Sequence, residues 1–459
     1  MTQLDDSERE AAVADLFTPR ARRQRWLDVE AALAGAEADA GVVPAEAAQA
    51  IAAHADFDLI DEDALTAAEA AAGHVMVPLV AALAELAGPE HGGWVHWGAT
   101  TQNIQQTGDT IGIRDAHRVL VGRLERVLRV LADLAERHAD TVMAGRTHGQ
   151  HAVPITFGFK AAVWADIMAR NLQRMREVEP RLFVSMTGGA AGTFATFGDV
   201  GPQIQRGVAD RVGLVPMPLP SRAVIDHFAE WVSALGLIAA SAQSIAEEVV
   251  RLMSAEFGEV EEALPATDVG SSTMPQKRNA KTSMGIITAA AQARALVPLA
   301  LEATIQAHEV DGARSAMMDR AVEQSAVLVD GILEGLERVL SGLIVHPSRM
   351  RENLTLTRGL ISAEAVMMRL AERIGRQQAH AVVHTAAVRS ATSGELFADV
   401  LAADPAVADR LTAEEIRVLL DPREHVGLSA RLARETADRV RAAADRVDGG
   451  AGAAKVSPP

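Results

Sequence analysis

The stretch between Pro220 and Pro265 contains no proline and repeats apolar residues at three- and four-residue steps. The residues of this repeat are Val232, Leu235, Ile238, Ala242, Ile245, Val249 and Leu252. A repeat of about 3.5 residues sustained this far predicts a long α-helix that buries one seam against helices of similar length. The fold must therefore supply such partners.

Two further segments carry seams of the same kind. The first contains Leu120, Leu124, Val127, Leu131 and Leu134, and the second contains Met318, Val322, Ser325, Val329, Ile332, Leu336, Val339 and Leu343. Another helical pattern runs from about Gly158 to Val178 and is expected to stop at Pro180. One chain thus supplies roughly four or five long helices, and the apolar faces left over predict that subunits share a bundle.

The composition favours helix over sheet. Aromatic residues make up 3% of the chain and tyrosine is absent, whereas sheets are rich in aromatic and β-branched residues. The absence of cysteine excludes disulfides and thiolate metal sites and fits a cytoplasmic protein. The formal charge of −17 argues against partners such as nucleic acid or an anionic membrane. No run of about 18 apolar residues predicts a membrane span.

The same patterns predict an all-α protein with three helical domains. Residues 1–110 hold several short helices and end in a polar run, 91–110, that is predicted as a loop. Residues 111–350 form the central domain of long helices, and residues 351–445 form a compact C-terminal helical domain. The tail, 446–459, is rich in glycine and proline and is predicted to be disordered.

Polar segments interrupt the helical patterns. The sequence LPATDVGSSTMPQKRNAKTS, residues 264–283, contains glycine and prolines that forbid a continuous helix, and we call it the 264–283 loop. Hydroxyls, cations and amides crowd into it, which predicts a mobile lid with a catalytic serine. Two other polar segments contain histidine, His96–Asn103 and Gly145–His151. The glycine-rich segment 187–201 lacks the Lys-Ser/Thr ending of a phosphate loop and is predicted as a turn.

Three of these segments resemble one known family. GSSTMPQKRN, residues 270–279, is similar to the signature loop of the fumarase/aspartase superfamily. GRTHGQHAVP, residues 145–154, resembles its Thr-His segment, and HWGATTQNIQQT, residues 96–107, resembles its first conserved region. The resemblance implies a homotetramer built on a bundle of long helices, with each active site shared by three subunits.

The resemblance also implies a reaction, elimination across the Cα–Cβ bond of a succinyl group. Ser271 would be the general base, and the carbanion would be held as an aci-carboxylate by preorganised donors. The loop would have to close over the substrate and exclude water before a serine could act as a base. His148 would be the general acid toward the leaving group. Ser271 as a helix N-cap is the structural alternative.

Further residues are implied to bind the substrate. They are Thr100, Thr101, Thr147, Gln150, Lys277, Asn279, His96, His74, Ser272, Met274 and Arg314. For His74 and His96, support of other site residues is the alternative to substrate contact, and for Arg314 it is a surface position. No cofactor is implied, and no metal, because no carboxylate cluster accompanies His148 and His151.

The chain departs from its nucleotide-processing relatives at the positions that would hold a phosphate. Val224 and Ile225 stand where those relatives carry a Gln-Arg pair, and Asn103 stands where relatives commonly have Asp. A smaller substrate fits better, such as an N-substituted aspartate or nitrosuccinate, with cleavage of a carbon–nitrogen bond and release of fumarate. The alternatives are a 3-carboxy-cis,cis-muconate cycloisomerase, an adenylosuccinate lyase and a non-catalytic structural homologue.

Overall fold

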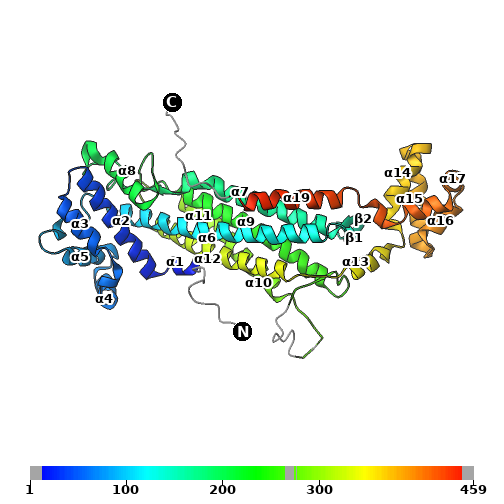
Figure 1. The fold of residues 1–459 in the computed structure, drawn as a ribbon, viewed down its shortest axis with the longest axis horizontal. Helices are drawn as coiled ribbons and strands as arrows, with labels where there is room; N and C mark the ends of the chain where they lie inside the picture. Colours follow the sequence, from blue (N-terminus) through cyan, green and yellow to red (C-terminus); the bar gives the residue numbers. More distant parts are fainter. Residues whose placement is uncertain (1–12, 264–272, 275, 447–459) are drawn as a thin grey trace. The chain divides into compact units, whose positions relative to one another are not determined.

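The computed structural model describes residues 13–263, 273–274 and 276–446. Within them the helices are α1 Val13–Leu16, α2 Pro19–Asp39, α3 Ala45–His54, α4 Glu62–Ala72, α5 Met76–Ala87, α6 Thr101–Arg137, α7 Phe157–Leu182, α8 Gly201–Val212, α9 Asp226–Met253, α10 Lys281–Ala295, α11 Val297–Ala303, α12 Gly312–Ser341, α13 Pro347–Leu354, α14 Ala363–Ile374, α15 Arg376–Ser393, α16 Phe397–Ala403, α17 Pro405–Ala408, α18 Ala413–Leu419 and α19 Ser429–Ala444. Helix dominates (Figure 1), which confirms the predicted all-α class.

Short strands pair into two-stranded sheets. Within the described ranges they are β1 Val142–Thr147 with β2 Gln150–Thr156, β3 Val184–Ser185 with β4 Val215–Pro216, and β5 Val260–Glu261 with β6 Ile344–Val345. The first and third pairs are antiparallel and the second is parallel. None of these strands was predicted from the sequence.

By their internal contacts the residues group into two units. Unit 1 holds 1–123, 171–240 and 288–333, and unit 2 holds 124–170, 241–287 and 334–459. The long helices α6, α7, α9 and α12 contribute residues to both units. The predicted domain boundaries after residues 110, 350 and 445 stay a prediction. The predicted disordered tail lies outside the described residues except for Arg446.

The predicted seams are buried. Every residue of the three repeats has a relative exposure of 9% or less. Burying a leucine, valine or isoleucine side chain contributes about 1.5–3 kcal/mol, so each seam contributes a large share of the hydrophobic stabilisation. The long-helix prediction from periodicity is therefore confirmed by α6, α9 and α12.

Two predicted helix boundaries were wrong. The run 91–110 was predicted as a loop, but α6 begins at Thr101, so the second half of that run is helical. Helix α7 does not stop before Pro180 but continues to Leu182. Pro180 lies in the last turn, where the missing N–H removes one hydrogen bond, and Phe183 N still donates to Glu179 O at 3.0 Å.

The core of unit 1 is built around α2. Thr18 caps this helix, accepting a hydrogen bond from Ala21 N, and Pro19 occupies its first turn, a favourable place for proline. Apolar residues of α2, α3 and α5 then form one buried cluster that includes Trp26, Leu27, Leu33, Ile51, Leu79 and Leu83. Helix α8 packs closely on α2, because a Cβ on Gly207 would lie only 2.9 Å from Ala36 Cβ.

The core of unit 2 has a separate helical cluster. Helices α14 to α18 bury Leu370, Val383, Phe397, Leu401 and Ile416 in one group, and Figure 1 shows α14 to α17 gathered together. Helix α19 is held to residues 133–166 by ion pairs, including Arg441 with Asp133 at 2.7 Å and Arg439 with Asp166 at 2.7 Å. These pairs are partly exposed, so each contributes about 1 kcal/mol or less.

Candidate active site

The Thr-His segment folds into the tip of the β1–β2 hairpin. Thr147 pairs with Gln150 across the hairpin, which leaves His148 and Gly149 as its two turn residues. Their φ angles are 53° and 77°, the positive values that a type I′ turn requires at both central positions. Glycine adopts this conformation freely, whereas histidine does so only under strain. The turn presents the exposed side chain of His148.

A buried ion pair fixes the base of this hairpin. Arg146 Nη1 and Nη2 donate to Glu259 Oε2 and Oε1 at 2.9 and 2.6 Å. The Glu259 side chain is fully buried and also accepts from Asn353 Nδ2 at 2.8 Å. The Arg146 guanidinium stacks over the Phe257 ring, 4.8 Å from its centroid. Such bidentate pairs are strong and directional, so they hold the strand that carries Thr147 and His148.

The same acidic segment fixes both ends of the 264–283 loop. Before the loop, β5 pairs with β6 and Glu262 is buried. The last three residues of the loop already belong to α10, and there Thr282 N and Ser283 N donate to the Glu262 carboxylate at 2.9 and 3.1 Å, which caps α10 at its positive end. Arg278 Nε lies 2.5 Å from Glu261 Oε1. The loop is thus tied at its base by two adjacent glutamates.

The loop residues predicted for catalysis are described only in part. Ser271 and Ser272 lie outside the described residues. Met274 and Lys277 are exposed and Asn279 is partly buried. Lys277 N donates to Met274 O at 3.0 Å, which forms a turn within the loop.

The first conserved-region segment forms the start of α6 in unit 1. Thr100 is the residue before the helix, and Thr100 N donates to Asn103 Oδ1 at 3.1 Å, as in one half of a capping box. Thr100 and Thr101 are partly buried at this helix start. Backbone N–H groups at a helix start attract negative charge, as carboxylate binding requires.

Asn103 uses both ends of its amide and is fully buried. Its Oδ1 also accepts from Gly189 N at 3.1 Å, and its Nδ2 lies 3.4 Å from Gly189 O and 3.2 Å from Met186 Sδ. An ionised aspartate could make the accepting contacts but not the donating ones. The asparagine at this position therefore connects α6 to the glycine-rich segment.

His96 is paired with a buried glutamate. Its Nδ1 donates to Glu30 Oε1 at 2.6 Å, and the Glu30 side chain is 1% exposed. Burial lowers the pKa of His96, but the hydrogen bond and the charge of Glu30 outweigh it and the pKa is raised. Glu37 lies on α2 together with Glu30, and its pKa is raised to about 9 by burial and by the charge of Glu30. His96 is thus biased toward its charged form.

Two other predicted residues have structural partners. His74 Nδ1 accepts from Met76 N and Val77 N at 3.2 and 3.3 Å, so it caps the start of α5. Arg314 Nη1 pairs with Glu302 Oε1, which neutralises its charge. These contacts favour the structural alternatives for His74 and Arg314.

The structure therefore groups the predicted residues into two sets. In unit 1 the start of α6 carries Thr100 and Thr101, and unit 1 also holds His74, His96 and Arg314. In unit 2 the hairpin carries Thr147, His148 and Gln150, and the 264–283 loop carries the rest. Among the residues that are described, no cluster of three or more His, Asp or Glu side chains is placed to hold a metal ion.

A series of hydrogen-bonded polar side chains beside the start of α6 was not predicted from the sequence. Gln102 Nε2 donates to Ser315 Oγ at 3.2 Å, and Arg222 Nε donates to Gln102 Oε1 at 2.6 Å. A second arm of Arg222, Nη1, donates to Ala190 O at 3.0 Å. The one sequence feature that points to this site is the glycine-rich segment, because its glycines permit the close packing that brings Arg222 to the start of α6.

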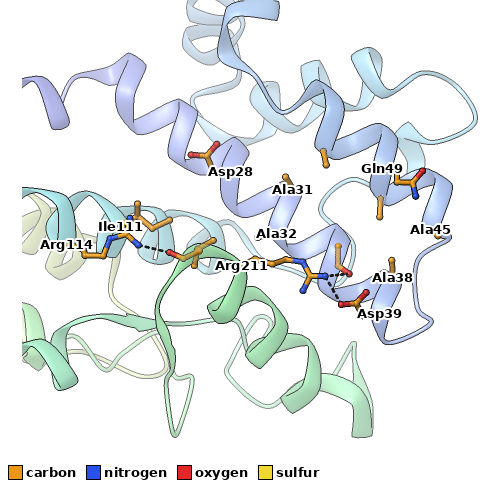
Figure 2. A pocket seen from close by; sticks show the side chains of 14 residues that line it. Asp28, Ala31, Ala32, Ala38, Asp39, Ala45, Gln49, Ile111, Arg114 and Arg211 are labelled. Atoms are coloured by element: carbon orange, nitrogen blue, oxygen red, sulfur yellow. Dashed lines mark hydrogen bonds and ion pairs between the residues drawn. The ribbon is translucent and has the colours of Figure 1, made fainter. Parts of the chain in front are cut away.

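A separate cavity of about 670 Å³ lies elsewhere in unit 1 (Figure 2). Alanines of α2 and α3 form much of its wall, and none of the predicted site residues lines it. At its edge Arg211 donates to Asp39 Oδ2 at 2.6 Å and to Gly35 O at 3.2 Å, as Figure 2 shows. These bonds join α8 to α2, which gives this arginine a structural role.

Comparison with known proteins identifies the family. A lyase family model matches residues 7–294, and a model of the adenylosuccinate lyase C-terminus matches residues 359–436. The chain is 41% identical to 3-carboxy-cis,cis-muconate cycloisomerase of Pseudomonas aeruginosa, covering 91% of this chain and 92% of that protein. It is 38% identical to adenylosuccinate lyase of Methanothermobacter thermautotrophicus, covering 89% and 92%.

A solved structure shares the fold. It is a fumarate lyase from Mesorhizobium sp. BNC1, with a TM-score of 0.87 and 36% identity, covering 93% of this chain and 97% of that one. The predicted family is confirmed. The chain is a lyase of the fumarase/aspartase superfamily, in the branch that contains the adenylosuccinate lyases and the 3-carboxy-cis,cis-muconate cycloisomerases.

Proposed function

We propose that this protein catalyses β-elimination from a small substituted succinate, breaking a carbon–nitrogen bond and releasing fumarate. The observation that carries the proposal is the placement of His148. It stands at an exposed turn in a positive-φ conformation, and the hairpin below it is clamped by Arg146 and Glu259. A strained residue on a rigid support is typical of a functional site.

In the proposed reaction Ser271 removes the proton beside a carboxylate, and the resulting aci-carboxylate is held by Lys277 and Asn279. His148 protonates the leaving group as the carbon–nitrogen bond breaks, and histidine is the side chain that most often performs such proton transfer. The remaining polar residues bind the substrate carboxylates, namely Thr100, Thr101, Thr147, Gln150 and Ser272. Closure of the loop excludes water, which strengthens these interactions.

The substrate is proposed to be small. The residues at 224 and 225 are Val and Ile, whose side chains offer a phosphate no hydrogen-bond donor, and Arg314 is neutralised by Glu302. A ribose phosphate would therefore lack charge-assisted hydrogen bonds worth about 1.5–3 kcal/mol each. An N-substituted aspartate or nitrosuccinate makes no such demand.

The assembly is proposed to be a cytoplasmic homotetramer with active sites shared by three subunits. No apolar run predicted a membrane span, but by length and mean hydropathy two described helical stretches could cross a membrane, α9 and Lys281–Ala303, which comprises α10 and α11. The most apolar window is 56% buried within the chain for α9 but only 22% buried for α10 and α11. Met284 and Leu301 are 48% and 53% exposed. Apolar helices left uncovered in one chain fit a subunit interface. Sedimentation at the 48.5 kDa chain mass, rather than at four times that mass, would contradict this assembly.

The cycloisomerase reaction is the second candidate, because the relative from Pseudomonas aeruginosa with that name is 41% identical. In that reaction the leaving group is a carboxylate of the same molecule, so no fragment is released. Incubation with 3-carboxy-cis,cis-muconate and analysis of the product by NMR distinguish the two reactions. A non-catalytic homologue would be free to lose Ser271, Lys277 and His148, and all three are present.

The test of the proposal is a panel of 2-substituted succinates carrying amino, N-alkylamino, nitro and thioether groups. Fumarate is followed by its ultraviolet absorbance. We expect one or more members to release fumarate, and Ser271→Ala to lower that turnover by at least about 100-fold, as general-base removal does. Full turnover by Ser271→Ala would refute the base assignment, and the absence of fumarate from every member would refute the function.

A further inference from the structure

Arg222 lies beside the start of α6 and is held there by neutral acceptors. Its Nε donates to Gln102 Oε1 at 2.6 Å and its Nη1 donates to Ala190 O at 3.0 Å. Gln102 is itself oriented, because its Nε2 donates to Ser315 Oγ at 3.2 Å. Because Ser315 Oγ donates to Asp311 O at 3.1 Å, it accepts from Gln102, and this fixes which end of the amide faces Arg222. The guanidinium is thus positioned by two bonds that do not neutralise it.

The glycine-rich segment explains why Arg222 can reach this place. A Cβ on Gly188 would lie 2.6 Å from Pro220 Cγ, and a Cβ on Gly192 would lie 2.5 Å from Pro220 O. Both glycines therefore let the segment that carries Arg222 pack directly on residues 188–192. Gly189 N also donates to Asn103 Oδ1 at 3.1 Å. Residues 188–192 thus link Arg222 rigidly to the helix start that carries Thr100 and Thr101.

The charge of Arg222 is not compensated within the described chain. No carboxylate of a described residue forms an ion pair with it, in contrast to Arg314, which pairs with Glu302. Burial lowers the pKa of Arg222, and no neighbouring charge opposes that effect. A partly buried cation without a counter-ion is costly, and an anionic ligand would remove the cost. The start of α6 adds further positive potential at the same place.

We propose that Arg222, positioned by Gln102, binds the departing substituent of the substrate when that substituent leaves as an oxyanion. The inference rests on the proposed function. In the case of nitrosuccinate, the base takes the proton from carbon, the carbon–carbon double bond forms, and the carbon–nitrogen bond breaks with its electron pair on nitrite. The negative charge that develops on the nitrite oxygens meets the guanidinium, whose planar fork suits a two-oxygen anion.

The experiment compares Arg222→Gln and Arg222→Lys with the wild type on two kinds of substrate. Nitrosuccinate releases an oxyanion, whereas aspartate and N-alkyl aspartates release an amine. We expect Arg222→Gln to lower kcat/KM for nitrosuccinate about 10- to 100-fold, as loss of a charge-assisted hydrogen bond does. For the substrates that release an amine, kcat/KM should change less than about 3-fold. Arg222→Lys should recover part of the loss, because it keeps the charge without the fork.

Product inhibition gives a second readout. Nitrite should inhibit Arg222→Gln more weakly than the wild type, while inhibition by fumarate stays the same. The matched control is Arg211→Gln, which removes an arginine of the same unit that also bonds a backbone carbonyl, Gly35 O. The control should leave the preference for nitrosuccinate over amines unchanged. Thermal melting of each variant establishes that it is folded.

The outcomes separate the inference from the proposed function. An equal loss on both substrate kinds would show that Arg222 only fixes residues 188–192 to α6, and the inference would fall. The inference would also be overturned, and the elimination would stand, if the wild type acted on amine-releasing substrates but not on nitrosuccinate and Arg222→Gln did not change inhibition by nitrite. A wild type that releases fumarate from no substrate would overturn both.

Discussion

The Arg146–Glu259 ion pair, which we call the clamp, holds the hairpin beneath His148. Glu259 is completely buried, and its carboxylate accepts two hydrogen bonds from Arg146 and one from Asn353. Glu259→Gln keeps the shape but removes the charge, which leaves a guanidinium that is only 13% exposed without its counter-ion. Breaking one side of a buried pair costs about 3–5 kcal/mol. We therefore expect Glu259→Gln to lower the free energy of unfolding by an amount in that range.

The assay is urea unfolding at one fixed protein concentration, since assembly contributes to apparent stability. The matched control is Glu334→Gln, which breaks the Arg338–Glu334 pair, whose side chains are 66% and 50% exposed. An exposed pair on one helix contributes about 0.3–0.5 kcal/mol, so the control should hardly change the midpoint. The double variant Arg146→Met/Glu259→Met should be more stable than Glu259→Gln, because no unpaired charge remains buried.

Activity is the second readout of the same variant. If the clamp positions His148, Glu259→Gln at a temperature where it is folded should slow substrates that need a proton on the leaving group more than those that do not. A Glu259→Gln variant as stable as the Glu334→Gln control would refute the reasoning about burial. If Glu259→Gln lowered the activity toward both kinds of substrate by the same factor, the positioning role would be refuted.

Three further predictions concern the proposed site. His148→Ala should lower turnover of amine-releasing substrates about 100-fold or more and affect nitrosuccinate less, as steady-state kinetics would show, and an equal effect would contradict the acid role. Asn103→Asp should lower the free energy of unfolding by about 1–3 kcal/mol, because the buried donor to Gly189 O is lost and a charge is buried. Urea unfolding would show this as a lower midpoint. Glu30→Gln should lower the pKa of His96, measured by NMR titration. Because the folded pKa of His96 is raised, the stability that Glu30 confers is complete below the unfolded pKa of 6.5 and is lost as pH rises through the folded pKa. A stability difference that grew with pH would contradict this.

The long helices could be predicted because periodicity reports burial directly. Leu235, Val329 and Leu131 sit at seam positions and are fully buried, so the pattern and the packing agree. The start of α6 could not be predicted in this way. Residues 101–110 are mostly polar, and the helix there depends on tertiary bonds such as Thr107 Oγ1 to Met186 O at 3.4 Å and on the Asn103 contacts to Gly189.

The hairpin was missed for a related reason. A type I′ turn is signalled by Asn-Gly or Asp-Gly, and the turn here is His148-Gly149. The strand that leads into this turn is held by the Arg146–Glu259 pair, whose members are far apart in sequence. For the site, the family motifs predicted the candidate residues, but not that the charge of Arg314 is neutralised by Glu302 or that the charge of Arg222 has no counter-ion among the described residues.

The acidic segment before the 264–283 loop limits how that loop can act. Glu259 holds the hairpin, Glu261 pairs with Arg278, and Glu262 caps α10, so three glutamates within four residues have three different partners. These carboxylates are therefore structural and not part of a surface charge that merely aids solubility. The proposed closure of the loop must leave these contacts intact or break an interaction that involves a buried carboxylate. Because Glu259 contacts the hairpin and Glu262 contacts α10, the backbone that supports His148 and the backbone that follows Asn279 share one anchor. A substitution in this segment should thus change the proposed acid and the proposed loop together, whereas a substitution of Thr100 or Thr101 should change carboxylate binding and leave the acid unchanged.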